Sequence, residues 1–234
     1  MRGALAIPLL ALLTLLLGGP AVIAGLLDPT GRLPHDVVRV WGRLFLRIVG
    51  IRVELEGLGH IPRGPAVFAA NHSSALDIPI MFGYLPVRFR IIHKRSLILI
   101  PVIGWFLFVS GHIAIDRRGG FRAKRSLESA ARRIRGGTSL VVFPEGTRSA
   151  DGRVGPFKRG SFILALKAAV PVIPVSLIGV KRLIPNGVLS LRKGTVRLEI
   201  LPALSVFGRG PEDAAALAAE VREAVATACA GSSP

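Results

Sequence analysis

Cysteine and two of the aromatic residue types are scarce in this chain of 234 residues. Its single cysteine, Cys229, excludes an intrachain disulfide framework, a zinc ribbon and a CxxC redox site. The five histidines lie apart, without the spacing of metal ligands, so we expect no metal and no cofactor. With one Tyr, two Trp and no recognisable binding module, the chain lacks the exposed aromatics that usually accompany Lys and Arg in nucleic-acid binders. We therefore expect no nucleic-acid partner.

Acidic residues are also few, since 14 Asp and Glu stand against 31 Lys and Arg and leave a formal net charge of +17. Such an excess favours anionic partners, such as lipid headgroups or phosphorylated substrates. Half of the residues are hydrophobic and the mean hydropathy is +0.54, which excludes a disordered chain. Together these values favour a protein that works at a membrane surface on a phosphate-bearing molecule.

The N-terminus contains the longest uncharged segment, Gly3 to Leu27. One helix of that length would be long enough to cross a bilayer, but Pro8 and the cluster Gly18 to Pro20 are expected to interrupt it. A membrane span and a shallow re-entrant hairpin both remain open. The small residues of Ala21 to Gly25 also leave room for a cleaved secretory signal.

The next segment, Asp36 to Val49, is predicted to be a helix with a stripe of charges. Positive charge gathers after the apolar segment, at Arg32, Arg39, Arg43 and Arg47. If the apolar segment crosses the cell membrane, the positive-inside rule places the rest of the chain on the cytoplasmic side. The stripe fits a helix lying in a lipid interface, although an ordinary helix packed on the core would look similar. We expect residues 1–50 to form a membrane anchor and residues 51–234 a catalytic domain.

From Ile51 onward, short apolar strands alternate with helical stretches, which predicts one α/β domain with a sheet flanked by helices. The predicted strands are Val53–Leu55, Ala66–Ala70, Phe89–Ile92, Ile113–Ile115, Ser139–Phe143, Val172–Ser176 and Thr195–Leu201. The predicted helices are Ser73–Phe82, Leu97–Val109, Phe121–Arg135, Gly160–Ala169 and Pro211–Ala228. Ligand sites of such sheets form where strands end.

The first polar cluster, Asn71 to Asp77, follows a predicted strand directly and contains a histidine and a carboxylate. His72 and Asp77 can meet only if His72 lies in a turn and Asp77 inside the helix, with Ser73 or Ser74 as the helix N-cap. An Asp that accepts one imidazole N–H leaves the other ring nitrogen free as a general base. The alternative is a serine cap with the histidine simply packed in the turn.

Two further clusters also follow predicted strands. In Phe143 to Ser149, Gly146 lets the backbone approach a ligand, Thr147 donates hydrogen bonds, and Arg148 presents a fork suited to phosphate. A surface turn with an ion pair between Glu145 and Arg148 would look the same. The third cluster ends at Arg117, which we expect to contact phosphate.

Taken together, the three clusters resemble the membrane-associated PlsC-type 1-acylglycerol-3-phosphate (lysophosphatidic acid) acyltransferases. Asn71 to Asp77 matches the NHxSxxD motif of that family, Phe143 to Ser149 its FPEGTRS motif, and Gly111 to Arg117 and Val170 to Val175 its second and fourth motifs. The resemblance covers roughly Val53 to Ser176, and four motifs in order are far more specific than one. It implies a single mixed sheet flanked by helices, as in glycerolipid acyltransferases.

The resemblance also implies an activity and roles for particular residues. The enzyme would move a fatty acyl group from acyl-CoA or acyl-carrier protein to the hydroxyl of lysophosphatidate, forming phosphatidate among membrane phospholipids. His72 would be the general base and Asp77 its orienting partner. The residues that would hold the acceptor are Arg117, Glu145, Gly146, Thr147 and Arg148, with Lys94 nearby.

Two other classes of function compete with this interpretation. One is a lipid ester or thioester hydrolase with Ser73 or Ser74 as the nucleophile, although the chain contains no GxSxG elbow. A membrane-attached binder of anionic lipid would need no catalysis at all. Transfer to a different lyso-lipid acceptor is a further alternative within the acyltransferase class.

Overall fold

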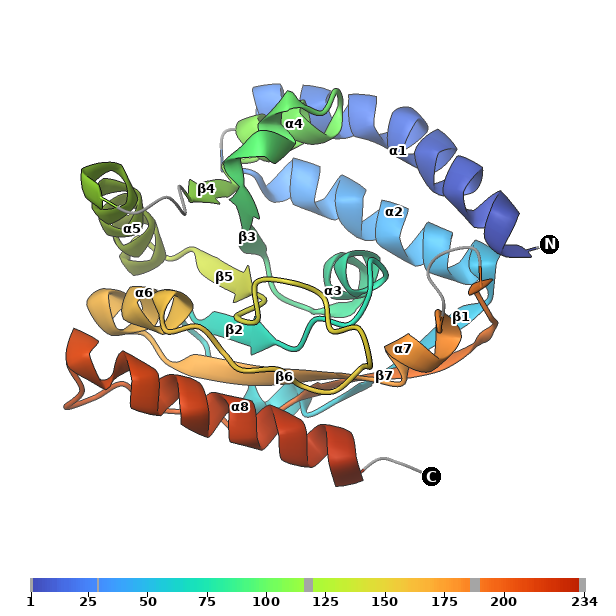
Figure 1. The fold of residues 1–234 in the computed structure, drawn as a ribbon. Coiled ribbons are helices and arrows are strands. Elements are labelled where there is room, and N and C mark those ends of the chain that lie inside the picture. The colour runs from blue at the N-terminus through green and yellow to red at the C-terminus, as the bar shows by residue number, and fades with distance from the viewer. Residues whose placement is uncertain (1, 29, 116–119, 186–189, 232–234) are drawn as a thin grey trace.

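The computed structural model describes residues 2–28, 30–115, 120–185 and 190–231, and it begins with an apolar helix followed by an amphipathic one (Figure 1). Helix α1 (Arg2–Leu27) runs without a break through Pro8 and Pro20, so the expected interruption is wrong. A proline removes one backbone hydrogen bond, but packing along α2 (Arg32–Val49) and against α4 (Ile103–Val109) supports the helix around it. By length and composition, its segment Pro8–Leu27 is apolar enough to cross a membrane.

Helix α2 begins four residues before the predicted start because a side chain outside the predicted segment caps it. The Asp28 carboxylate accepts the backbone N–H groups of Arg32 and Leu33, each at 2.8 Å. The arginine stripe does not simply face lipid, since Arg43 donates to the Gly83 carbonyl at 2.7 Å and Arg39 to the Val87 carbonyl at 3.4 Å. For these two arginines the interface interpretation is wrong, because their guanidinium groups bind backbone carbonyls of the domain.

Over the described residues, seven strands form one mixed sheet in the order β1-β7-β6-β2-β5-β3-β4. Strands β6 and β7 pair antiparallel, whereas every other neighbouring pair is parallel. The strands are β1 (Ile51–Glu56), β2 (Val67–Ala70), β3 (Phe89–Lys94), β4 (Ile113–Ile115), β5 (Ser139–Val142), β6 (Val172–Ile178) and β7 (Gly194–Ile200). Each overlaps a predicted strand, so the predicted fold class is confirmed.

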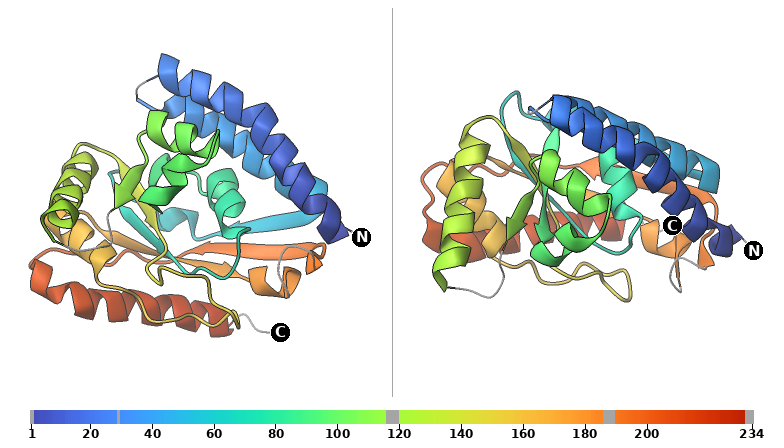
Figure 2. Two further views of the ribbon diagram at one scale, coloured as in Figure 1. Left: turned by 45° about the horizontal axis from the view of Figure 1, so that its top comes forward. Right: turned by 90° about the horizontal axis from the view of Figure 1, so that it is seen from above.

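Helices cover both faces of the sheet, which explains why its central strands are apolar on both sides (Figures 1 and 2). Phe68 of β2 packs into a core with residues of α2 and α3, while its neighbours Val67 and Ala69 pack into a second core with residues of α5, α6 and α8. The remaining helices are α3 (Asp77–Tyr84), α5 (Gly120–Arg135), α6 (Gly160–Ala168), the unpredicted α7 (Val180–Leu183) and α8 (Ala214–Gly231), with 3-10 turns η1 (Leu58–His60), η2 (Arg95–Leu99) and η4 (Pro211–Asp213).

The expected boundary at residue 50 falls in the turn between α2 and β1. Phe45 and Leu46 of α2 nevertheless lie in the same core cluster as Phe68 of the sheet. The N-terminal helices therefore share hydrophobic packing with the α/β portion.

The topology places the ends of β2 and β5 side by side, because the two strands are parallel neighbours. Both polar clusters that follow them, Asn71 to Asp77 and Phe143 to Ser149, therefore meet at one edge of the sheet. Asn71 secures the end of β2 against β6: its amide oxygen accepts the N–H of Leu177 at 2.7 Å and its amide nitrogen donates to the Leu177 carbonyl at 3.1 Å.

Candidate active site

A histidine and a buried carboxylate meet at the end of β2. His72 lies in the turn after the strand and Asp77 is the first residue of α3, so the two side chains come together as the sequence required. Nδ1 of His72 lies 2.7 Å from Oδ2 of Asp77. A carboxylate only accepts hydrogen bonds, so Nδ1 carries the proton, and Nε2 of the neutral ring has a free lone pair.

The turn is held by Asp77 rather than by a serine cap. The same Oδ2 atom accepts the backbone N–H groups of Ser73 and Ser74, each at 2.8 Å, and the Asp77 side chain is fully buried. The residue that precedes the helix is Leu76, so the expected N-cap at Ser73 or Ser74 is wrong. The carboxylate thus organises the turn and orients the imidazole at once.

The cluster after β5 packs directly against His72. The ring of Phe143 stacks on the imidazole with centroids 4.3 Å apart and an interplanar angle of 27°. Glu145 is buried, and its Oε1 accepts the backbone N–H of His72 at 2.8 Å while its Oε2 accepts that of Gly155 at 3.3 Å. Burial raises the pKa of the Glu145 carboxyl, and the two N–H donors oppose that rise.

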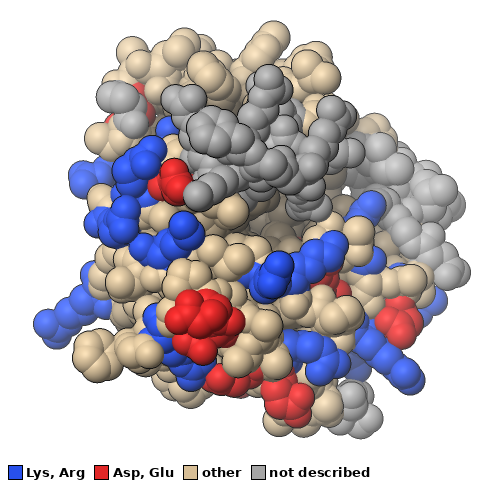
Figure 3. Space-filling model, turned by 60° about the vertical axis from the view of Figure 1, so that its left-hand side comes forward, with Lys and Arg blue, Asp and Glu red and all other residues tan. Residues whose placement is uncertain are grey.

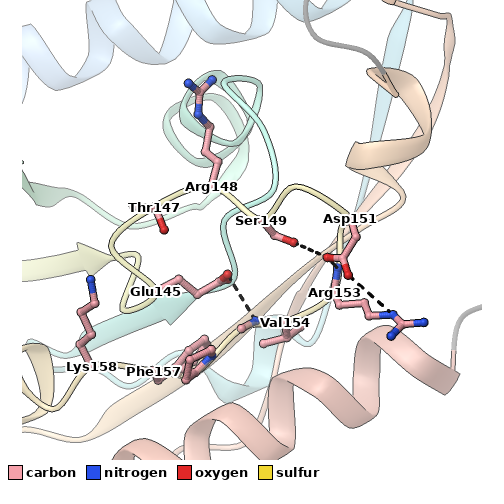
Figure 4. A pocket seen from close by; sticks show the side chains of 11 residues that line it. Glu145, Thr147, Arg148, Ser149, Asp151, Arg153, Val154, Phe157 and Lys158 are labelled. Atoms are coloured by element: carbon pink, nitrogen blue, oxygen red, sulfur yellow. Dashed lines mark hydrogen bonds and ion pairs between the residues drawn. The ribbon is translucent and has the colours of Figure 1, made fainter.

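The other side chains of this loop line a polar pocket of about 490 Å³ (Figure 4). Thr147 and Arg148 are exposed, and Arg148 rises from the loop away from Glu145, so the alternative of an ion pair between those two residues is wrong. Gly146 has φ +75°, a left-handed conformation that residues with a side chain rarely adopt, so glycine is favoured there. Three cations line the pocket. Arg153 lies 3.8 Å from Asp151, and Arg148 and Lys158 are suited to a phosphate.

Two expected phosphate contacts are not placed here. Lys94 ends β3, paired with Ile115 of β4, and so its backbone lies at the same edge of the sheet, while its side chain is outside the described part. Arg117 lies outside the described residues altogether. Within the described residues, no group of three or more His, Cys, Asp or Glu is placed to hold a metal ion. On the face shown in Figure 3, Lys and Arg are spread more widely than Asp and Glu, as the net charge requires.

An apolar cavity of about 340 Å³ lies beside the dyad, on the side covered by α1 and α4. Ala75 and Ile78, on either side of Asp77, contribute to its wall. The opposite wall comes from α1, including Gly18, and from Val102 before α4. The site therefore combines a histidine–aspartate pair, a pocket lined by basic side chains and an apolar cavity.

Sequence reasoning did not assign roles to Asn71, Phe143 and Lys158. Asn71 and Phe143 lie within segments that match motifs, whereas Lys158 lies beyond the segment Phe143 to Ser149. Asn71 and Phe143 contact Leu177 and His72, which lie far away in the chain, whereas Lys158 lies near Gly146 of the same loop. Local spacing does not report such contacts.

Comparison with known proteins agrees with this arrangement. Residues 52–178, which hold the dyad and the loop after β5, match the acyltransferase family. The chain belongs to this family. The crystal structure of the 1-acyl-sn-glycerophosphate (LPA) acyltransferase PlsC from Thermotoga maritima is similar to this acyltransferase, with a TM-score of 0.78 and 29% identity over 99% of this chain and 97% of that one.

Curated relatives of this acyltransferase carry related names. A chloroplastic 1-acyl-sn-glycerol-3-phosphate acyltransferase of Arabidopsis thaliana is 34% identical over 80% of this chain and 52% of its own length. The 1-acyl-sn-glycerol-3-phosphate acyltransferase alpha of Homo sapiens is 36% identical over 77% of this chain and 64% of its own length. The match thus spans about half of the plant protein.

Proposed function

We propose that this acyltransferase moves a fatty acyl group from a thioester of CoA or acyl-carrier protein to the free hydroxyl of lysophosphatidate, forming phosphatidate. The observation that carries the proposal is the 2.7 Å contact between Nδ1 of His72 and the buried Asp77, beside a cationic pocket. The printed names of the relatives in Arabidopsis and human, and of the Thermotoga structure, point to the same acceptor.

In the proposed reaction His72 acts as general base. Its Nε2 takes the hydroxyl proton as the acceptor oxygen attacks the thioester carbonyl, and a tetrahedral intermediate forms. The carbon–sulfur bond then breaks, and the protonated imidazole returns the proton to the thiolate. Asp77 holds the imidazole in one tautomer and stabilises its positive charge. Transfer is direct and needs no acyl-enzyme.

We assign the pocket to the phosphate of the acceptor and the apolar cavity to a fatty chain. Arg148, Thr147 and Lys158 bind the acceptor phosphate, because guanidinium and ammonium groups form charge-assisted hydrogen bonds with it. The apolar cavity takes a fatty chain, since its walls are nearly all hydrocarbon. Because Ala75 and Ile78 flank Asp77, a chain held there would present its polar end to His72.

The decisive assay follows release of free thiol from acyl-CoA, or from acyl-carrier protein, by the purified full chain. An acyltransferase releases thiol only when lysophosphatidate is added and forms phosphatidate in equal amount. Release without acceptor would instead establish a hydrolase and overturn the proposal.

Arg148→Ala tests the phosphate contact. With lysophosphatidate we expect kcat/KM to fall about 10- to 100-fold, as for the loss of one charge-assisted hydrogen bond. With a monoacylglycerol, which has no phosphate, the change should stay below about threefold. An equal loss with both acceptors would contradict the assignment.

We further propose that α1 and α2 contact the cell membrane and that the edge of the sheet with His72 lies on its cytoplasmic side. Large apolar side chains are exposed along both helices, including Leu15 and Leu16 of α1 and Leu44 and Ile48 of α2. Exposed apolar surface of this extent on neighbouring helices is typical of lipid contact. The double variant Leu15→Asp, Leu44→Asp should sediment with anionic vesicles less than the wild type does; equal sedimentation would exclude these faces.

A further inference from the structure

We propose that Glu145 is a positioning residue that holds the main chain of His72 and makes no contact with the acceptor phosphate. The inference rests on the proposed function, because positioning matters only if His72 is the base. It replaces the role that the family resemblance implied for Glu145, which was to help hold the acceptor.

Both backbone polar groups of His72, its N–H and its carbonyl, form hydrogen bonds with the loop after β5. Its N–H donates to Oε1 of Glu145 at 2.8 Å, across 73 positions of sequence. Its carbonyl accepts the backbone N–H of Ser149, also at 2.8 Å. With Asp77 on Nδ1 and Phe143 on the ring face, both the main chain and the side chain of the base are fixed.

Both carboxylate oxygens of Glu145 already accept backbone N–H groups. Its second oxygen, Oε2, accepts the N–H of Gly155, so the carboxylate links the turn after β2 to the far end of its own loop. Arg148 points away from it in Figure 4, toward the opposite side of the loop. A carboxylate also repels a phosphate group, which makes a direct contact costly.

Holding this charge inside the protein is itself unfavourable. Glu145 is buried, and that burial raises its pKa. The backbone N–H of His72 requires a hydrogen-bond acceptor, and the ionised carboxylate of Glu145 provides one. Local features that cost stability are expected where a functional site needs them.

The contacts have a kinetic consequence. Thr147 and Arg148 belong to the same loop that holds the main chain of His72. One loop therefore positions both the proposed phosphate ligands and the proposed general base. Without Glu145 the phosphate contacts remain while the imidazole shifts. A misplacement of about 1 Å at a reacting group costs roughly 100-fold in rate. Loss of Glu145 should therefore lower kcat and leave KM for lysophosphatidate nearly unchanged.

Two substitutions separate reach from charge. Glu145→Ala removes both accepting oxygens, and Glu145→Asp keeps the charge but is one methylene too short to reach the same N–H group. Both should lower kcat about 100-fold, equally with lysophosphatidate and with monoacylglycerol. Near-normal activity of Glu145→Asp would show that charge alone matters and would overturn the proposal.

Glu54→Ala is the matched control. Glu54 is an exposed carboxylate on the edge strand β1, outside the pocket and away from the loop after β5. Its kcat should stay within about threefold of wild type. A 100-fold loss in this variant would mean that removing any glutamate charge stops turnover, which contradicts a specific role for Glu145.

A spectroscopic measurement tests the contact without using activity. Protein labelled with 15N-histidine has five backbone amide signals, one for each histidine. In Glu145→Ala the signal of His72 should shift upfield and lose protection from hydrogen exchange, while the other four stay in place. An unmoved His72 signal, or a rise in KM with kcat unchanged, would overturn the proposal. If the wild type does not transfer acyl groups at all, the proposed function fails, but the amide result still decides whether the contact exists.

Discussion

The catalytic edge of the sheet and the apolar cavity beside it are built in opposite ways. At the edge, His72 is held by short directional bonds to Asp77, Glu145 and Ser149. Around the cavity, α1 approaches α4 through glycine: a Cβ at Gly18 would lie only 2.2 Å from a methyl carbon of Val102. The edge depends on where single atoms lie, whereas the cavity depends on shape and volume.

This difference predicts how each region should respond to mutation. Removing one polar atom at the edge should affect turnover more than stability, because reaction rates depend steeply on geometry. Removing or adding a methyl group near the cavity should affect stability first, since close-packed interiors respond to volume. The following predictions test that contrast in order of decreasing expected effect.

The largest effect is expected at the base itself. His72→Ala should lower kcat by about 10² to 10⁴, the usual contribution of a general base. The ring is only partly buried, so the midpoint of thermal unfolding should move little. Initial rates and a melting curve of the same preparation check both statements. A variant with more than half of the wild-type rate would remove His72 from the mechanism.

Asp77→Ala should affect activity and stability together, because Asp77 holds the turn as well as the imidazole. The substitution leaves the backbone N–H groups of Ser73 and Ser74 without their acceptor in a buried place. Each unsatisfied buried donor costs about 1 to 3 kcal/mol, so we expect the free energy of unfolding to fall by about 3 kcal/mol. Urea unfolding measures it, and a stability equal to that of His72→Ala would contradict the structural role.

The apolar side contains a group that should make stability depend on pH. Burial lowers the pKa of His35 to about 4, and its ring packs against Phe89 with centroids 4.9 Å apart. The unfolded chain binds a proton there below pH 6.5 and the folded chain does not. The contribution of His35 to the free energy of unfolding is therefore fully present above pH 6.5. It is lost as the pH falls toward 4, by up to about 3 kcal/mol.

His35→Phe keeps an aromatic ring at that position and removes the titration. Its unfolding free energy should change less between pH 7 and pH 5 than that of the wild type. Parallel urea titrations at the two pH values provide the comparison. Identical pH dependence of the two proteins would show that His35 does not cause the acid sensitivity.

The smallest effects are expected from a pair of neighbouring glycines in α1. Gly18→Ala places a methyl group against Val102 and should destabilise by about 1 to 3 kcal/mol. Gly19→Ala has no atom within 4 Å of the new methyl group and should stabilise by about 0.5 to 1 kcal/mol through better helix propensity. Opposite shifts of the melting temperature are expected; equal shifts would mean that α1 does not pack closely on α4.

Much of the fold could be predicted from the sequence, and the failures share a cause. Apolar segments and turn residues placed every strand of the described sheet within a few residues. By contrast, Pro8 and Pro20 predicted breaks in α1 that do not occur, because neighbouring helices support it. In the same way, Arg43 was assigned to lipid but binds the Gly83 carbonyl.

At the site, whether a contact could be predicted depends on how far apart its two residues lie in the sequence. The meeting of His72 and Asp77 could be predicted because five positions and one turn link them. The role of Glu145 could not, because its partner His72 lies 73 positions away and nothing in either segment shows the pairing. The same holds for the two bonds between Asn71 and Leu177, which join positions 106 residues apart.

By itself the sequence determined where strands and helices form and which reactive groups are available, since these follow from local pattern and side-chain chemistry. Only the tertiary structure decided that α1 is continuous, that Glu145 binds the main chain of His72, and that an apolar cavity lies beside the dyad. Each of these depends on atoms brought together by the pairing of β2 with β5 and by the packing of α1 on α4, and contacts over such distances leave no periodic signal in the chain.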